Sequence, residues 1–477
     1  MWAAEVRRAP YPLPRERTLS GWGRTSASVC RVLTPREEEQ VGGALEGCAG
    51  GALPANAIAR GAGLSYGDAA QNTGGAVIDM SALNRVLSID PERGQLTAQA
   101  GVTIAQILSS LAPYGMTLPV VPGTRHVTLG GAIGSDIHGK NHHRDGGFAR
   151  HVVRMSLQTP DGAVAEISPE SDAELFYATL GGMGLTGVVT AATIRTEPQT
   201  APWMEVDTDR TNTLHETLAK MGEEERHRYS VAWLDLLAGG SAFGRAVVSR
   251  ADPLAATTTT PTVAPWRLAI QNHPERFTRR ARWTVPERIP GALLAPAGVR
   301  AFNAAWWRAA PRHERARPVP LAPYFFPLDG VGNWNRLYGP AGLLQYQFVI
   351  PLGSESDLQR CFEVIRTQRL PVYLAVFKRF GSAFGGPLSF PIEGWTLALD
   401  IPAQAAGVRQ TLDRLDEMVA GAGGRVYLAK DARLRPELLG AMYPQLERFR
   451  AIRRRVDPDG LLRSDLAARL GLCEAAA

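Results

Sequence analysis

The chain has 477 residues, of which 45% are hydrophobic and 21% are charged. This length and balance predict a globular protein with a large core and two domains, and they exclude a disordered chain. The formal net charge of +6 is mild for this length, and the sequence contains no basic arm and no zinc-finger pattern. Nucleic acid is therefore not expected as a partner.

The cysteines of the chain are far apart and form no CxxC pair. They are Cys30, Cys48, Cys361 and Cys473. This spacing predicts neither a metal site nor a disulfide framework, and reduced thiols fit the cytoplasm. We find no apolar leader and no apolar run of membrane-spanning length. We therefore expect a cytoplasmic protein, with peripheral contact at the inner face of the membrane or a periplasmic association as the alternatives.

The first glycine-rich loop of the chain follows an expected strand at 57–60. It consists of Arg60, Gly61, Ala62, Gly63, Leu64, Ser65, Tyr66, Gly67 and Asp68. Glycines allow backbone N–H groups to wrap an anion, so the loop predicts a nest for a diphosphate. A plain glycine-rich turn is the alternative. The Rossmann fingerprint G-x-G-x-x-G is absent after the first strand.

A second glycine-rich stretch covers residues 122–143. Its small residues at 128–135 can lie flat against a planar cofactor. Three histidines follow them, but no carboxylate or thiolate other than Asp136 is near enough in sequence to complete a metal site. We predict no metal, and we expect His142 and His143 at the surface.

Three further elements complete the first 200 residues. We expect a strand at 75–79, a helix at 174–180 that ends at Gly181 and Gly182, and a Val- and Thr-rich strand at 187–194.

The middle of the chain, from about 252 to 320, predicts a long loop that is partly mobile, because it is rich in proline and carries a threonine run. Aromatic residues alternate with arginines in it. These are Trp266, Phe277, Trp283, Trp306 and Trp307, with Arg276, Arg279, Arg280, Arg282 and Arg308. Aromatic residues beside cations are typical of a membrane headgroup interface, so we expect a lid over about 253–317 that meets the membrane. The alternative is that these tryptophans belong to the core.

The last third of the chain predicts two successive strand–helix–strand units. The expected order is strand 343–350, a helix capped by Ser354, strand 372–378, strand 395–400, a helix around 412–419, and strand 425–430. Such a pattern indicates an α+β sheet with helices on one face.

Alternation along these strands places polar side chains together. Gln345 and Gln347 share one face of their strand, Thr396 and Ala398 likewise share a face, and Lys378 and Lys430 close corresponding strands. Polar residues on one face and helices on the other predict the floor of a pocket.

The motifs resemble the flavin domain of the vanillyl-alcohol-oxidase/p-cresol-methylhydroxylase (PCMH) superfamily. RGAGLSYGD at 60–68, PGTRHVTLGGAIGSDIHGKNHH at 122–143 and GGMGLTGVV at 181–189 carry the likeness. It continues at 332–335, 338–351, 387–392 and 456–458, and it is greatest for the decaprenylphosphoryl-β-D-ribose 2′-oxidase family. The resemblance implies an α+β, two-domain PCMH-type fold. Its domains are an FAD-binding domain at 10–200, a substrate domain with an antiparallel sheet at 201–420, and a C-terminal return at 421–477.

The resemblance also implies roles for individual residues. The FAD diphosphate should bind at the loop 60–68. The flavin should be lined by Gly123, Thr128, Leu129, Gly130, Gly131, Ser135, Asp136, Ile137, His138, Val189 and Tyr427. The substrate side should contain Tyr66, His138, Lys140, Gln345, Gln347, Lys378, Thr396, Ala398 and Lys430. We expect Lys430 to supply charge, Gln347 to orient the hydroxyl and Lys378 to pair with a phosphate. The proton acceptor stays open among His138, Tyr66 and Lys430.

The sequence departs from the family at two positions. Leu64 stands where many relatives carry the histidine that links FAD covalently, so FAD should be held without a covalent bond. Ala398 stands where the mycobacterial enzymes have a cysteine beside the flavin.

The resemblance therefore implies FAD-dependent oxidation of the 2′-hydroxyl of a polyprenylphosphoryl-β-D-ribose, as the first half of an epimerisation to the arabinose form. An NAD(P)H-dependent keto-reductase would be its partner. The alternatives are an O₂-using oxidase of a sugar, an alditol or an aminoglycoside, and a flavin-free binding scaffold.

Overall fold

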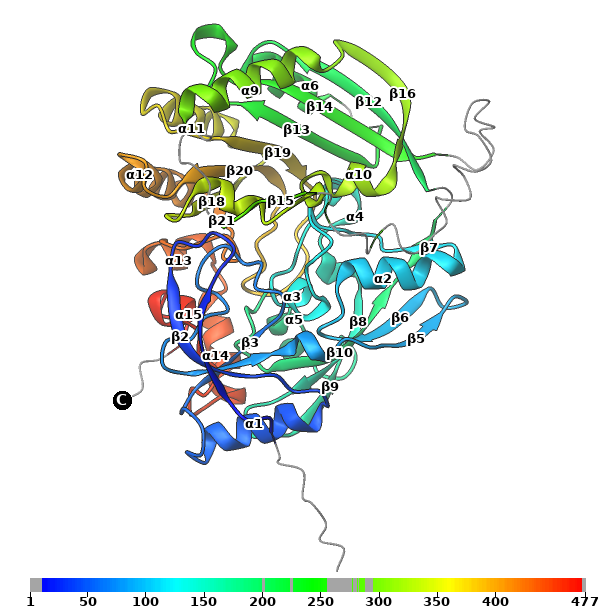
Figure 1. The fold of residues 1–477 in the computed structure, drawn as a ribbon, viewed down its shortest axis with the longest axis vertical. Helices are drawn as coiled ribbons and strands as arrows, with labels where there is room; N and C mark the ends of the chain where they lie inside the picture. The colour runs from blue at the N-terminus through cyan, green and yellow to red at the C-terminus, as the bar shows by residue number, and fades with distance from the viewer. Residues whose placement is uncertain are drawn as a thin grey trace, which may run out of the picture.

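The computed structural model describes residues 11–199, 202–223, 226–254, 277, 281, 283–287 and 295–473. Two sheet-containing halves lie one above the other, the N-terminal half below and a large sheet above (Figure 1). Both mix helices and strands, so the predicted α+β, two-domain PCMH-type fold is confirmed.

The N-terminal half contains two sheets and short helices. The four-stranded sheet has the order β1 (Arg15–Ser20), β2 (Ala27–Leu33), β4 (Ala76–Asp79), β3 (Ala57–Arg60). The five-stranded sheet has the order β5 (Val86–Asp90), β6 (Gln95–Gln99), β10 (Val188–Arg195), β8 (Val152–Gln158), β9 (Val164–Ile167). The helices are α1 (Glu39–Ala49), α2 (Ile104–Leu111), α3 (Leu129–Gly134), α4 (His142–Asp145) and α5 (Ala173–Thr179). A two-stranded ladder joins β7 (Met116–Thr117) to β11 (Glu197–Pro198).

The elements predicted in this half are present. The strands expected at 57–60, 75–79 and 187–194 correspond to β3, β4 and β10, and the helix expected at 174–180 corresponds to α5. The parallel strands β3 and β4 are apolar and mostly buried, as strands covered on both faces usually are.

The upper half is built on one antiparallel sheet of eight strands. Their order is β16 (His313–Pro320), β12 (Trp203–Thr211), β14 (Arg245–Pro253), β13 (Tyr229–Asp235), β19 (Leu374–Phe380), β20 (Gly394–Pro402), β18 (Leu343–Pro351), β21 (Arg425–Val426). A short parallel pair, β15 (Trp283–Thr284) with β17 (Val331–Gly332), lies outside this sheet.

Helices lie against both faces of the large sheet, so the expectation that helices cover only one face is wrong. On one face are α6 (Leu214–Gly222), α11 (Glu355–Thr367) and α12 (Val408–Gly421). Adjacent residues of β12 show the difference, because Thr211 contacts Thr217 of α6 whereas Arg210 contacts Trp307 of α9 (Pro296–Ala309). The strands β12, β14, β13 and β19 are paired in this order, and their register places Arg210 on the same face of the sheet as Val376 and Lys378. Therefore α9 lies on the same face as the polar residues of the predicted pocket.

Three further details of the elements predicted from the sequence are wrong. The long loop expected over 252–320 contains α9 and β16, with α10 (Leu321–Phe325) directly after it. Residues 255–276, 278–280, 282 and 288–294 lie outside the described part of the chain, including Trp266, Arg276, Arg279, Arg280 and Arg282. The strand expected at 425–430 ends at Val426, and Lys430 lies in the turn that follows. Ser354 holds the N-cap position of α11, but its side chain makes no capping hydrogen bond.

The C-terminal segment runs back to the N-terminal half after β21. It contains α13 (Leu439–Met442), α14 (Leu446–Val456) and α15 (Asp465–Arg469), and the last two lie near the N-terminal strands in Figure 1. Leu462 forms a β-bridge with Ala57, and Arg469 pairs with Asp68 at 2.8 Å. The end of the chain thus supports the first glycine-rich loop.

Candidate active site

The first glycine-rich loop presents a row of backbone donors. Among the described residues, the N–H groups of residues 62–65 donate no hydrogen bond. Gly63 has φ +68°, and a Cβ there would collide with the guanidinium of Arg60. Arg60 braces the loop, since it donates to the carbonyls of Ala70 at 2.9 Å and Ser20 at 2.8 Å. Unpartnered amides around a left-handed glycine suit a diphosphate, so this loop fits FAD.

The second glycine-rich stretch packs directly against the first. A Cβ on Gly61 would collide with the hydroxyl of Thr128, which also caps α3 by accepting a hydrogen bond from the Gly131 N–H. Gly123 has open space around its Cα, with no atom within 4 Å of a built Cβ. The two stretches therefore form one continuous wall with room beside Gly123.

The other residues expected to line the flavin differ in their exposure. Leu129, Asp136 and Ile137 are buried, whereas Leu64, Gly123, Gly130, Gly131, Ser135 and Val189 are exposed or half-buried. Asp136 accepts a hydrogen bond from the Ala149 N–H at 2.9 Å, and burial raises the pKa of its carboxyl to about 6. The Asp136 side chain is therefore held by a hydrogen bond to the backbone inside the fold. His142, expected at the surface, is buried and packs against Phe380, so that prediction is wrong.

Tyr66 and Gln345 meet where the two halves face each other. The Nε2 of Gln345 lies 3.0 Å from the Tyr66 hydroxyl and 2.5 Å from Oδ1 of Asp400. Gln345 and Asp400 are paired in the register of β18 and β20. Burial, together with the charge of Asp400, raises the pKa of the Tyr66 phenol well above its usual value. Tyr66 is therefore a neutral hydroxyl at physiological pH.

Lys430 lies over the ring of Tyr66, with Nζ 4.1 Å from the ring centroid. Its turn is fixed from both sides. The Tyr66 N–H donates to the Ala429 carbonyl at 3.0 Å, and the Tyr427 hydroxyl donates to the Ser135 carbonyl at 2.8 Å. Burial lowers the pKa of Lys430, and attraction to Asp400 opposes that change.

His138 and Gln347 form a buried pair on the same sheet face. The Gln347 Nε2 donates to His138 Nε2 at 2.9 Å and to the Thr396 hydroxyl at 3.2 Å. Burial, then the charges of Lys378, His142 and Lys430, lower the pKa of His138 well below its usual value. The lone pair of this neutral imidazole is already used, so His138 has no free site to accept a proton in this arrangement.

Lysine is rare in this chain, and its positions are informative. Only four of the 52 Lys and Arg residues are lysines, at 140, 220, 378 and 430. Two of them act on a third: burial, then Lys430 and Lys140, lower the pKa of Lys378 to about 7. Burial also lowers the pKa of Lys140 to about 7, and its ammonium lies over Tyr324 and donates to that residue's carbonyl. Three of the four lysines thus lie where the sheet faces the glycine loops, and lysine is a compact point charge whose pKa shifts readily on burial.

Sequence reasoning missed Asp400. It follows Thr396 and Ala398 on the same face of β20, so alternation could have found it. Ala398 is half-buried within a strand whose neighbouring residues are buried.

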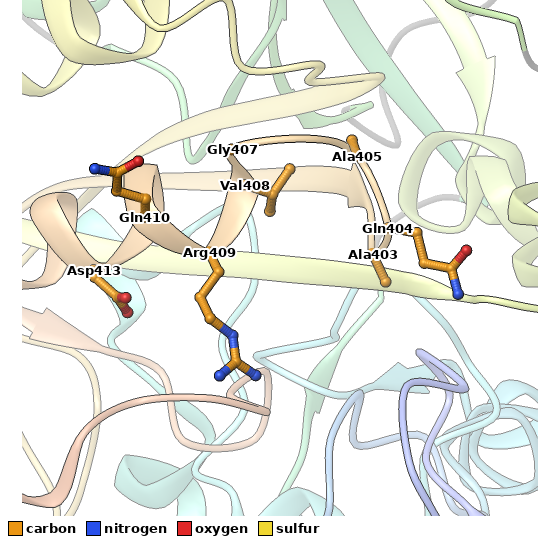
Figure 2. A pocket seen from close by; sticks show the side chains of 8 residues that line it. All are labelled: Ala403, Gln404, Ala405, Gly407, Val408, Arg409, Gln410 and Asp413. Atoms are coloured by element: carbon orange, nitrogen blue, oxygen red, sulfur yellow. The ribbon is translucent and has the colours of Figure 1, made fainter.

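A separate surface hollow of about 450 Å³ lies where β20 leads into α12 (Figure 2). Its lining runs from Ala403 to Asp413 and includes none of the residues expected to bind substrate or FAD. It has no titratable group in common with the site described above.

Comparison with known proteins connects this geometry to a family. Residues 30–168 match the FAD binding domain model, and residues 403–470 match the D-arabinono-1,4-lactone oxidase model. The decaprenylphosphoryl-beta-D-ribose oxidase of Mycolicibacterium smegmatis is 41% identical over 467 residues, which cover 97% of this chain and 99% of that protein. The chain belongs to this family of flavoprotein oxidases. It is an FAD-dependent oxidoreductase.

Two other relatives show how far the similarity extends. An uncharacterised protein of Streptomyces coelicolor is 39% identical over 381 residues, 78% of this chain and all of that protein. The L-gulonolactone oxidase of Bos taurus is 37% identical over 127 residues, 27% of this chain and 29% of its own length. Sugar-acid lactone oxidases therefore share a limited part of the chain. Within the described residues, no helix is long and apolar enough to cross a membrane.

Proposed function

We propose that this enzyme oxidises the 2′-hydroxyl of a polyprenylphosphoryl-β-D-ribose, as the first half of an epimerisation to the arabinose form. The observation that carries the proposal is the cluster of Lys140, Lys378 and Lys430 beside Tyr66 and Gln345. A phosphodiester-linked sugar brings an anion that needs cations, together with hydroxyls that need neutral donors and acceptors. The M. smegmatis relative is named for such a substrate, and its similarity over nearly the whole chain supports the same proposal.

The roles in this proposal follow from charge and contact. FAD supplies the hydride acceptor, and the protein orients the sugar and handles charge. Lys378 binds the phosphate, because it is half-buried on the sheet face opposite α11 and α12 and has no ion-pair partner among the described residues. As the hydride leaves for the cofactor, the 2′-hydroxyl releases its proton to water, and the positive charge of Lys430 next to the reacting centre stabilises the developing alkoxide. Tyr66 donates a hydrogen bond to a sugar oxygen, because Gln345 already donates to the phenol oxygen.

The loops that hold FAD are proposed to use backbone atoms more than side chains. Residues 62–65 would receive the diphosphate on their unpartnered N–H groups, and the open side of Gly123 would accept the flavin ring. Thr128, Gly130 and Gly131 shape this wall through their contacts within it.

Product analysis tests the function. The purified enzyme, a polyprenylphosphoryl-ribose, an electron acceptor that reoxidises the flavin, NAD(P)H and an NAD(P)H-dependent keto-reductase should together yield the arabinose epimer. Omitting the reductase should leave the 2-keto sugar. An enzyme that instead oxidises free alditols or aminoglycosides with O₂, and leaves the lipid-linked ribose unchanged, would support the alternative oxidase function.

We further propose that α9 brings the enzyme to the membrane that holds the lipid tail. Phe302 and Trp306 stack with ring centroids 6.3 Å apart, and their side chains are 64% and 54% exposed. Exposed Arg300 and Arg308 lie on the same helix. Exposed aromatic rings beside cations suit an anionic lipid surface, and α9 lies on the sheet face that carries the lysines.

Sedimentation with anionic vesicles at low salt tests this contact. Wild type should sediment, and Trp306→Ala with Phe302→Ala should release it, as should neutralisation of Arg300 and Arg308. Equal sedimentation of all variants, or none by wild type, would refute the membrane contact while leaving the proposed oxidation intact. Leu13→Ala, which removes another exposed apolar side chain far from α9, is the matched control.

A further inference from the structure

Asp400 is a buried carboxylate that the proposed chemistry does not yet use. It is 1% exposed and lies on β20, on the sheet face that carries the lysines. Its Oδ1 accepts a hydrogen bond from Gln345, and its Oδ2 is buried with no hydrogen-bond partner among the described residues. A buried carboxylate with one free oxygen is costly unless a cation or a ligand compensates it.

The groups that face Asp400 come from four separate segments. Gln345 on β18 and Tyr66 in the FAD loop form the hydrogen-bonded chain, and Lys430 contributes its charge from the turn after β21. Tyr338 lies in the short helix Trp334–Tyr338 and stacks on Tyr373. Burial, then the charge of Asp400, raise the pKa of its phenol. Lys430 also lowers the pKa of Lys378, and of the lysines only Lys430 lowers the pKa of Asp400.

From this geometry we propose that Asp400 is a positioning residue of the proposed reaction, with two effects. It fixes the amide of Gln345 so that Nε2 points at Tyr66, which leaves the Tyr66 proton for the substrate. It also supplies negative charge to the site of Lys430, whose ammonium lies over the ring of Tyr66 in the chain that Gln345 joins to Asp400. The inference rests on the proposed function only for the second readout described below.

The first effect follows from hydrogen-bond chemistry. An amide nitrogen carries two donors, and here one is directed to a carboxylate and the other to the phenol oxygen. If the amide were reversed, its oxygen would face the carboxylate, so the charge on Asp400 selects the observed orientation. Tyr66 then receives a hydrogen bond from Gln345 and keeps its own O–H free.

The second effect follows from Coulomb attraction at low dielectric. Burial disfavours the ammonium of Lys430, and Asp400 is the group that opposes this loss. Replacing Asp400 by Asn keeps the size and the acceptor for Gln345 but removes the charge. The pKa of Lys430 should then fall by about one unit or more.

The small number of lysines allows a direct measurement on the FAD-bound protein without substrate. Lysine labelled with ¹³C at Cε gives four signals, which Lys→Arg variants assign. We expect the Lys430 signal of Asp400→Asn to titrate at a lower pH than in wild type. Asp400→Glu should restore much of the wild-type value. Asp416→Asn is the matched control, since Asp416 is equally buried and pairs with Arg433 instead.

The second readout is the pH profile of flavin reduction by a polyprenylphosphoryl-ribose without O₂. In Asp400→Asn the alkaline loss of rate should begin at a lower pH, whereas in Asp416→Asn it should not move. An unchanged Lys430 titration in folded, FAD-bound Asp400→Asn would overturn the inference, and so would loss of FAD or of the fold, since the role would then be structural. If the lipid-linked ribose is not oxidised at all, the proposed function fails, and the NMR titration still decides the role of Asp400.

Discussion

Lys430 is the residue whose removal should affect the proposed chemistry most. Its ammonium lies 4.1 Å from the Tyr66 ring centroid, in a turn fixed to the FAD loop by backbone hydrogen bonds. Lys430→Met should slow flavin reduction by substrate on the order of 10²–10³-fold, because a positioned charge in a water-poor site is lost. FAD should stay bound. Stopped-flow reduction measures the rate, and Lys220→Met, at a partly exposed ion pair with Glu223, is the control.

Lys378 should give the enzyme a pH dependence in substrate capture. Burial, then Lys430 and Lys140, lower its pKa to about 7, so its charge is present below that pH and is lost as the pH rises through it. A substrate that carries a phosphate should therefore show kcat/KM falling above about pH 7. Lys378→Met should lower kcat/KM and flatten this part of the profile. A profile that is the same in wild type and Lys378→Met would exclude Lys378 as the phosphate ligand.

At the level of single residues, alternation along a strand predicted much of the sheet face and missed part of it. Gln345 and Gln347 do share a face, but Gln347 is buried and engaged by His138 and Thr396. The sequence could not show that engagement, because His138 lies more than 200 positions away in the chain. A similarly long separation hid the chain in which Gln345 joins Asp400 to Tyr66.

Two neighbouring tryptophans of α9 should have different roles. Trp307 lies between the guanidinium groups of Arg210 and Arg245, 4.4 and 4.6 Å from its ring centroid, and its Nε1 donates to the Thr211 carbonyl at 2.8 Å. Trp306 is exposed. Trp307→Ala should lower the free energy of unfolding by about 2 kcal/mol, whereas Trp306→Ala should change it little. Chemical denaturation measures both, and equal effects would show that Trp307 does not anchor the helix.

The elements that sequence reasoning misjudged share a physical cause. The prolines and arginines of the region 296–320 favoured a loop, yet α9 forms on an alanine-rich stretch because Arg210 donates hydrogen bonds to its C-terminal carbonyls and Trp307 packs on the sheet. These partners come from β12, about 90 residues earlier, so local sequence carries no sign of them. After Val426, the contact of the FAD loop with Ala429 turns the chain and ends the strand. Where elements depend on local periodicity, as in α5, α11 and α12, the predictions are confirmed.

For the molecule as a whole, the cofactor should be held without a covalent bond. Leu64 offers no nucleophile at the position where many relatives of the resembled superfamily carry a linking histidine, and the described loop presents backbone amides instead. Acid precipitation should leave the yellow flavin in the supernatant. A yellow pellet would show that another side chain makes a covalent link.

The structure joins two halves through their facing surfaces, so the proposed activity requires both. The N-terminal half brings the glycine loops and Tyr66, the sheet brings Gln345, Lys378 and Asp400, and the C-terminal return brings Lys430. Neither the loops nor the sheet alone contains a complete set of groups for a phosphorylated sugar. The substrate is therefore the point on which the whole account depends.

Anaerobic mixing of the purified flavoprotein with a polyprenylphosphoryl-β-D-ribose tests that point most directly. We predict that flavin absorbance bleaches in a single turnover, and that the same ribose without its phosphate-linked lipid bleaches it far more slowly. A flavin that stays oxidised with the lipid-linked ribose, but is bleached by a free sugar, lactone or alditol, would contradict the proposed function.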